Sequence, residues 1–222
     1  MNEWVFLLLL GLLGVSSHEQ RPVPVSREPD HHLKFENAFV RAYDVVVPPG
    51  GATLMHVHSL DYFFINFLDA TLKSTTAGQA EQDLLLKKGE VRFTPATLTQ
   101  QIRNVGRTPF HNLTVELLGT PAATPEASPP AVDNQRVLLE DGRIRAIEVS
   151  IGPGESTGMH THSTHTLLVA VDDGMLRSDT PSHKGEAARV RASQFAWYDA
   201  PLSHSLANDG DSILRLIEVE IK

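Results

Sequence analysis

Two pairs of histidines have a spacing that could bind a metal ion. One residue separates His56 from His58, and one residue separates His160 from His162. In a β-strand, residues i and i+2 point to the same face, so each pair can present two imidazoles to one point. The chain has 11 histidines and no cysteine, so any metal must be held by nitrogen and oxygen ligands. Such ligands suit a divalent Fe, Mn, Zn, Ni or Cu ion, and the choice among these stays open.

The two histidine pairs belong to an internal repeat that covers most of the chain. Residues 36–74 align without a gap with residues 140–178, and 14 of the 39 aligned pairs are identical, including both histidines. The same offset later pairs Asn104 with Asn208. One frame maintained over about 80 residues indicates that a whole domain was duplicated.

The segments that must position the histidines have the pattern of β-strands. Val40–Val47 and Ile144–Ile151 alternate in part and end at turns rich in Gly and Pro. Leu113–Leu118 and Leu214–Ile221 are apolar runs that close the two copies. Many short strands with Gly and Pro turns favour a sandwich or a closed barrel. We therefore predict an all-β chain with two barrels of the same topology.

Composition outside the two copies predicts an export signal and two connecting segments. Trp4–Val15 is an apolar run that is too short to span a bilayer. It suits a secretory signal peptide, so we expect a periplasmic or secreted protein with no membrane attachment after the signal is removed. Pro-rich stretches indicate an arm and a linker. The expected order is signal peptide (1–17), N-terminal arm (18–35), barrel 1 (36–118), linker (119–134) and barrel 2 (135–222).

The charge of the chain bears on its partners. The formal net charge is −8 and no basic stripe is present, which argues against nucleic acid and against anionic lipid as partners. We expect a small-molecule ligand. A homo-oligomer is compatible with the sequence.

The residues at the turns resemble the cupin superfamily. Its first motif is G(X)5HXH(X)3,4E(X)6G, and in both copies a glycine precedes the HxH pair by the required five residues. Its second motif is G(X)5PXG(X)2H(X)3N, which Gly89, Pro95 and Asn104 follow in the first copy and His204 and Asn208 in the second. The resemblance implies a tandem bicupin made of two double-stranded β-helix (jelly-roll) barrels, with a divalent metal inside a barrel. It does not indicate a subfamily.

Both copies depart from the cupin motifs at expected ligand positions. The usual glutamate, four residues after the second histidine, is replaced by Tyr62 and by Thr166. The third histidine is present as His204 in the second copy and is replaced by Gln100 in the first. By these motifs, neither copy has the complete set of three histidines and one glutamate.

These departures predict one strong and one weak metal site. We expect barrel 2 to hold a divalent ion through His160, His162 and His204, with His165 as a candidate fourth ligand. Barrel 1 is expected to hold a metal weakly or not at all, through His56, His58, Asp61 and Gln100. The alternatives are a relic site in barrel 2, whose histidines only form hydrogen bonds, and a structural barrel or metal-free ligand pocket in barrel 1. His31 and His32 precede the first barrel and are interpreted as arm residues or a surface pair.

Two functions are compatible with this pattern. The first is a metal-dependent enzyme of the dioxygenase, decarboxylase or isomerase type, acting on a small oxygenated acid or a sugar-like molecule. No general acid or base is recognisable near the motifs, and Tyr198 and Asp199 are the nearest titratable candidates. The alternative is a non-catalytic cupin that binds a metal or a small ligand.

Overall fold

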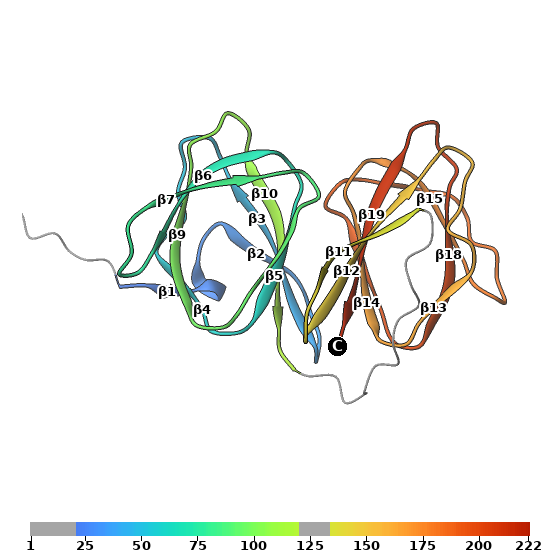
Figure 1. Cartoon of the computed structure of the whole chain (residues 1–222), viewed down its shortest axis with the longest axis horizontal. Coiled ribbons are helices and arrows are strands. Elements are labelled where there is room, and N and C mark those ends of the chain that lie inside the picture. The colour runs from blue at the N-terminus through green and yellow to red at the C-terminus, as the bar shows by residue number, and fades with distance from the viewer. Residues whose placement is uncertain (1–20, 120–133) are drawn as a thin grey trace, which may run out of the picture.

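The structure is a computed structural model that describes residues 21–119 and 134–222. Figure 1 shows two β-barrels side by side, the first coloured blue to green and the second yellow to red. The expected signal peptide lies outside the described residues, as does nearly all of the expected linker, so export stays a prediction. Within the described ranges, no helix is long and apolar enough to cross a membrane.

Barrel 1 consists of two five-stranded sheets. One sheet has the order β1 (Val23–Pro24), β4 (His56–His58), β9 (Leu98–Asn104), β6 (Ala70–Thr76) and β7 (Gln82–Leu86). The other has the order β2 (His31–Glu36), β3 (Val40–Val47), β10 (Phe110–Leu117), β5 (Tyr62–Asn66) and β8 (Val91–Thr94). A short 3-10 helix, η1 (Val25–Arg27), joins β1 to β2.

Barrel 2 repeats this topology. Its five-stranded sheet has the order β11 (Gln135–Glu140), β12 (Ile144–Ile151), β19 (Leu214–Ile221), β14 (His165–Ala170) and β17 (Phe195–Tyr198). Its four-stranded sheet has the order β13 (His160–His162), β18 (Leu202–Asn208), β15 (Gly174–Asp179) and β16 (Ala188–Val190). Strand for strand, this is the order of barrel 1 without β1. The prediction of two tandem jelly-roll barrels is therefore confirmed.

Residues from the expected arm are part of barrel 1. Strand β2 pairs along β3, and Val23–Pro24 pairs in parallel with the start of β4. The matching strand of barrel 2 is β11, which occupies the same edge of its sheet. The expected start of barrel 1 at residue 36 is therefore too late, because β2 begins at His31 and is already a strand of the barrel. Apolar alternation is absent from this segment, because β2 is an edge strand with mostly exposed side chains.

The sheet of barrel 1 that contains β3 and β10 packs against the five-stranded sheet of barrel 2, and one apolar core is buried between the barrels. Alternate residues of each strand enter this core, while the intervening residues face the interior of their own barrel. In β19, for example, Ile217 and Val219 belong to the core between the barrels and Leu216 belongs to the core inside barrel 2. The shared core takes buried side chains from both barrels, among them Val40, Phe63, Val115, Leu167, Val169 and Ile217.

Contacts at the edge of this shared core come in matched pairs. The ring of Phe39 lies 4.1 Å from the ring of His165. A guanidinium nitrogen of Arg143 lies 2.7 Å from a carboxylate oxygen of Asp61. Arg143 is the repeat counterpart of Phe39, and His165 is the counterpart of Asp61. The same two positions thus meet twice with the barrels exchanged, as at an interface with two-fold symmetry.

A buried asparagine holds the end of the strand that carries the third metal-ligand position in each barrel. The Nδ2 atom of Asn208 donates to the carbonyl oxygens of Ile151 (2.8 Å) and Ser212 (2.7 Å). Its Oδ1 accepts the amide of Gly210 at 2.9 Å. Asn104 makes the same three bonds in barrel 1. His204 lies four residues before Asn208 on β18, on the same face of the strand, so the anchor holds the end of the strand that carries it.

Candidate metal centre

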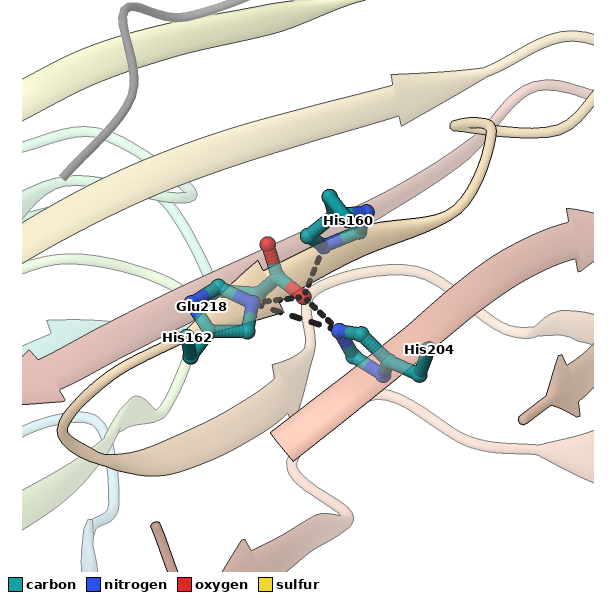
Figure 2. A group of neighbouring side chains, drawn as sticks. All are labelled: His160, His162, His204 and Glu218. Carbon is teal, nitrogen blue, oxygen red and sulfur yellow. Dashed lines mark hydrogen bonds and ion pairs between the residues drawn. The ribbon is translucent and has the colours of Figure 1, made fainter. Parts of the chain in front are cut away.

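Four side chains from three strands converge inside barrel 2 (Figure 2). His160 and His162 come from β13, His204 from β18 and Glu218 from β19. Each offers a ligand atom, and these atoms all lie within 4.8 Å of one another. His160 and His204 are register partners across the antiparallel pair of β13 and β18, which places the third ring beside the HxH pair.

The carboxylate of Glu218 lies at the middle of this group. Its Oε1 is 3.0 Å from Nε2 of His204, 3.4 Å from Nε2 of His162 and 3.6 Å from Nε2 of His160. Glu218 and His204 have no exposed side-chain surface, whereas 18% of the His160 side chain is exposed. Solvent therefore reaches the centre from the side of His160.

The unsatisfied polar atoms of the group fit a bound cation. Apart from the ion pairs with the histidines, neither carboxylate oxygen of Glu218 has a hydrogen-bond partner among the described residues. The same is true of Nε2 of His160. Buried polar atoms without partners are rare, because leaving them unpaired costs free energy. Three imidazole nitrogens and one carboxylate oxygen are the donors expected for a divalent transition metal.

Hydrogen bonds at the far sides of the rings orient the ligand atoms. Nδ1 of His162 lies 2.9 Å from Oε1 of Glu220. Nδ1 of His160 donates to the carbonyl oxygen of Gly158 at 3.1 Å. Both rings are therefore held with Nε2 toward the centre. Histidines that bind metals commonly have such a carboxylate or carbonyl partner, which fixes the tautomer and the ring orientation.

The charges of the centre favour a proton on His162 when no metal is bound. Burial alone would lower the pKa of His162, but hydrogen bonds with Glu218 and Glu220 outweigh burial and raise this pKa to about 9. Burial would likewise raise the pKa of Glu218, yet its ion pairs with the three surrounding histidines hold it well below its usual value. Near neutral pH the metal-free centre therefore combines an imidazolium with a carboxylate.

We expect metal uptake by barrel 2 to release a proton. Because the pKa of His162 is raised to about 9, its ring is protonated at neutral pH and must lose that proton before it can bind a metal. Zn²⁺ titrations near neutral pH should release about one proton per ion at this centre. The release should fall as the pH rises through about 9, because the ring then loses its proton before the metal binds. Calorimetry in buffers of different ionisation enthalpy measures it, and uptake without proton release at neutral pH would contradict the assignment.

His165 and Asp61, expected as additional ligands, do not point into their barrels. His165 begins β14 with the parity of Leu167, so its ring faces the other barrel and packs on Phe39. Its Nδ1 also lies 3.3 Å from Asp199, whose side chain is 79% exposed. Asp61 pairs with Arg143 across the interface. These two expectations were wrong: strand alternation turns His165 outward, and Asp61, just before β5, is held by Arg143 of the other barrel.

The sequence motifs missed Glu218. The usual cupin glutamate is sought four residues after the second histidine, where this chain has Thr166. Here the carboxylate comes instead from β19, whose inward-facing positions include Glu218 and Glu220. The statement that barrel 2 lacks a complete set of three histidines and one glutamate was therefore wrong. Two glutamates alternating with apolar residues in a closing strand were the available signal.

Barrel 1 places its predicted residues differently. His56 and Gln100 are register partners, which makes Gln100 the counterpart of His204. The Nε2 atom of Gln100 donates to the hydroxyl of Tyr62 at 3.2 Å. The ring of His58 stacks on Tyr62 at 3.9 Å. His31, interpreted as an arm residue, lies inside the barrel with its ring 5.0 Å from that of His56.

Two hollows are lined by residues of barrel 2. One, of about 780 Å³, is lined by Thr157 and Gly158, just before His160, and by Arg136. The other, of about 630 Å³, is lined mostly by apolar side chains of barrel 2, by Tyr198, and by Lys34 and Asp44 of barrel 1. The ring of Tyr198 lies 6.2 Å from that of His204, and burial raises the pKa of its hydroxyl. Tyr198 is therefore a neutral phenol close to the candidate ligands.

No protein-family model matches the chain. One curated relative is the beta-alanine degradation protein BauB of Pseudomonas aeruginosa. It is 31% identical over 104 residues, which make up 47% of this chain and 98% of the relative. The relative thus corresponds in length to a single barrel.

Solved structures resemble the whole double barrel. AerE from Microcystis aeruginosa has a TM-score of 0.63 at 12% identity, covering 88% of this chain and 98% of that one. A point mutant of Bacillus subtilis oxalate decarboxylase OxdC has a TM-score of 0.61 at 13% identity, covering 87% and 75%. The cupin 2 conserved barrel domain protein from Leptotrichia buccalis has a TM-score of 0.55 at 12% identity, covering 86% and 87%. At these identities the likeness concerns the fold alone.

Two tandem jelly-roll barrels, each with an HxH pair facing its interior, define this chain as a bicupin. The chain belongs to the cupin superfamily. Its histidine and glutamate groups could hold metal ions.

Proposed function

We propose that this chain is an exported, metal-dependent enzyme that acts on a small carboxylic acid at the centre of barrel 2. The observation that carries the proposal is the convergence of His160, His162, His204 and Glu218 within 4.8 Å. A divalent ion bound there would polarise a carboxylate or carbonyl oxygen of the substrate as a Lewis acid. The export part rests on the apolar run Trp4–Val15, and the mass of the mature N-terminus tests it.

The residues around the centre support an acid as the substrate. The hollow lined by Thr157 and Gly158, just before His160, also contains Arg136. The Arg136 guanidinium lies 2.9 Å from a carboxylate oxygen of Glu148, which shows that it suits a carboxylate partner. Tyr198 supplies a neutral phenol whose ring lies 6.2 Å from that of His204. One structural neighbour is an oxalate decarboxylase and the curated relative is named for β-alanine degradation, and both names refer to small carboxylic acids.

Turnover of small acids tests the catalytic proposal. Protein loaded with Mn²⁺, Fe²⁺ or Zn²⁺ is incubated with oxalate, β-alanine and related short acids while carbon dioxide release and oxygen uptake are followed. We expect turnover of at least one acid, with a loss of more than about 100-fold in Glu218→Gln, because the buried carboxylate is part of the ligand set. The exposed Glu186→Gln is the matched control and should retain activity. Metal binding without turnover of any acid would favour the non-catalytic alternative.

A further inference from the structure

The interior of barrel 1 holds a second group of histidines, which the centre proposed for barrel 2 does not use. His31 comes from β2, and His56 and His58 come from β4. One ligand atom from each of the three rings lies within 4.8 Å of those of the others. His56 and His58 are each 1% exposed, and the His31 side chain is 5% exposed. Three buried imidazoles in one place need a reason, since histidine is usually only partly buried.

The neighbours of these rings orient them as metal ligands. Nδ1 of His31 lies 2.6 Å from Oε2 of Glu28, a carboxylate that is itself buried. The same glutamate accepts the amides of Asp30 (2.8 Å) and Leu54 (3.0 Å), so it cannot easily turn away. Nδ1 of His56 donates to the carbonyl oxygen of Leu54 at 2.9 Å. Both rings therefore keep Nε2 available, as in the carboxylate–histidine–metal arrangement.

The two barrels exchange the position of their third histidine. Where barrel 2 has His204, barrel 1 has Gln100; where barrel 1 has His31, barrel 2 has Gln135. Each barrel thus combines an HxH pair with one further histidine, contributed by a different strand. If barrel 1 had only lost a metal ligand, it would have Gln100 in place of a histidine but no additional histidine at position 31. His31 gives barrel 1 a set of three histidines again.

Barrel 1 also has space beside its histidines. A cavity of about 230 Å³ is bordered by the three rings and by polar side chains, among them Tyr62, Gln100 and Thr114. Thr114 is the repeat counterpart of Glu218, so no carboxylate fills the corresponding position. A polar cavity of this size holds several water molecules, each needing about 30 Å³, or one small ligand. An ion held by three rings would therefore keep open coordination positions.

We propose that barrel 1 is a second metal centre, in which His31, His56 and His58 bind one divalent ion whose open positions face the cavity. The ligand set is three neutral imidazoles, whereas barrel 2 adds the negative charge of Glu218. The two centres of one chain therefore differ in charge and in strand origin. This inference does not depend on the function proposed for barrel 2.

Metal stoichiometry of single-site variants tests the second centre. Full-length protein is stripped with a chelator, loaded with excess Zn²⁺, desalted and measured by elemental analysis. The wild type is expected to carry two ions per chain. His31→Gln, which installs the residue that barrel 2 has at this position, should carry one ion fewer. His32→Gln is the matched control: this neighbouring histidine is exposed and should leave the content unchanged. Far-UV circular dichroism verifies that the variants are folded.

The outcomes separate this inference from the proposed function. One ion in the wild type, kept by His31→Gln and lost by His204→Ala, would overturn the second centre and leave barrel 2 intact. One ion lost by His31→Gln and kept by His204→Ala would overturn the centre of barrel 2 instead. If His31→Gln does not fold, His56→Gln should lose the same ion from a different strand. A folded His56→Gln with two ions would contradict the inference.

Discussion

His204→Ala is expected to lower the metal content by one ion per chain and to weaken binding in barrel 2 by more than about 100-fold, since even changes outside the ligand shell cost 10- to 100-fold. The His204 ring is fully buried, and its Nε2 lies 3.0 Å from Glu218. Removing it leaves a metal with one imidazole fewer beside a buried carboxylate. Elemental analysis and competition with a chromophoric Zn²⁺ chelator measure the two effects.

Gln100→Ala is the control for that experiment, because Gln100 has the same place in the register of barrel 1. Its side chain donates to Tyr62 and is outside both proposed ligand sets. We expect its metal content and affinity to equal those of the wild type. Equal metal content in His204→Ala and the wild type would remove the case for a centre on β18.

Phe63→Ala is expected to destabilise the whole molecule by about 3–5 kcal/mol, the usual cost of truncating a buried phenylalanine. Phe63 is fully buried in the core shared by the two barrels, next to Val115 and Phe93 along the sheet. The substitution would leave a cavity between the two packed sheets. Urea unfolding followed by tryptophan fluorescence measures the change in the free energy of unfolding.

Leu85→Ala provides the matched control for the shared core. Leu85 is a large apolar residue of the same barrel, but it is 66% exposed on β7. Its truncation should change the free energy of unfolding by no more than about 0.5 kcal/mol. A Phe63→Ala protein as stable as Leu85→Ala would show that the barrels are held together elsewhere.

The fold could be predicted from the sequence because the internal repeat and the strand pattern agree: both copies have the same expected strands at the same offset. A gap-free offset from His56 to His160 and from Asn104 to Asn208 required two domains with equal strand order. The convergence of His160, His162 and His204 followed from the cupin motifs. These relations are local or are set by the repeat, so no knowledge of packing between distant strands was needed.

Other parts of the site depended on packing that a motif does not encode. Glu218 is 56 positions beyond His162 and belongs to a different sheet, so only the packing of the two sheets of barrel 2 brings it near the HxH strand. His31 reaches the interior because β2 pairs with β3. Strand alternation would have shown that His165 and Thr166 face opposite sides of the sheet. Applying it required knowing at which residue β14 begins. An edge strand and a strand boundary are the features least determined by local sequence.

The matched contacts of Phe39 with His165 and of Arg143 with Asp61 describe an interface that a symmetric pair of identical chains could also form. In such a pair, every amino-acid change is made twice and appears at both ends at once. Covalent tandem linkage removes that restriction. One half can have glutamine where the other has histidine, as at Gln100 and His204. Likewise, one end of the interface has the ring contact of Phe39 with His165, and the other end has the ion pair of Arg143 with Asp61. The joined chain can therefore evolve its halves separately while retaining the packing of a dimer.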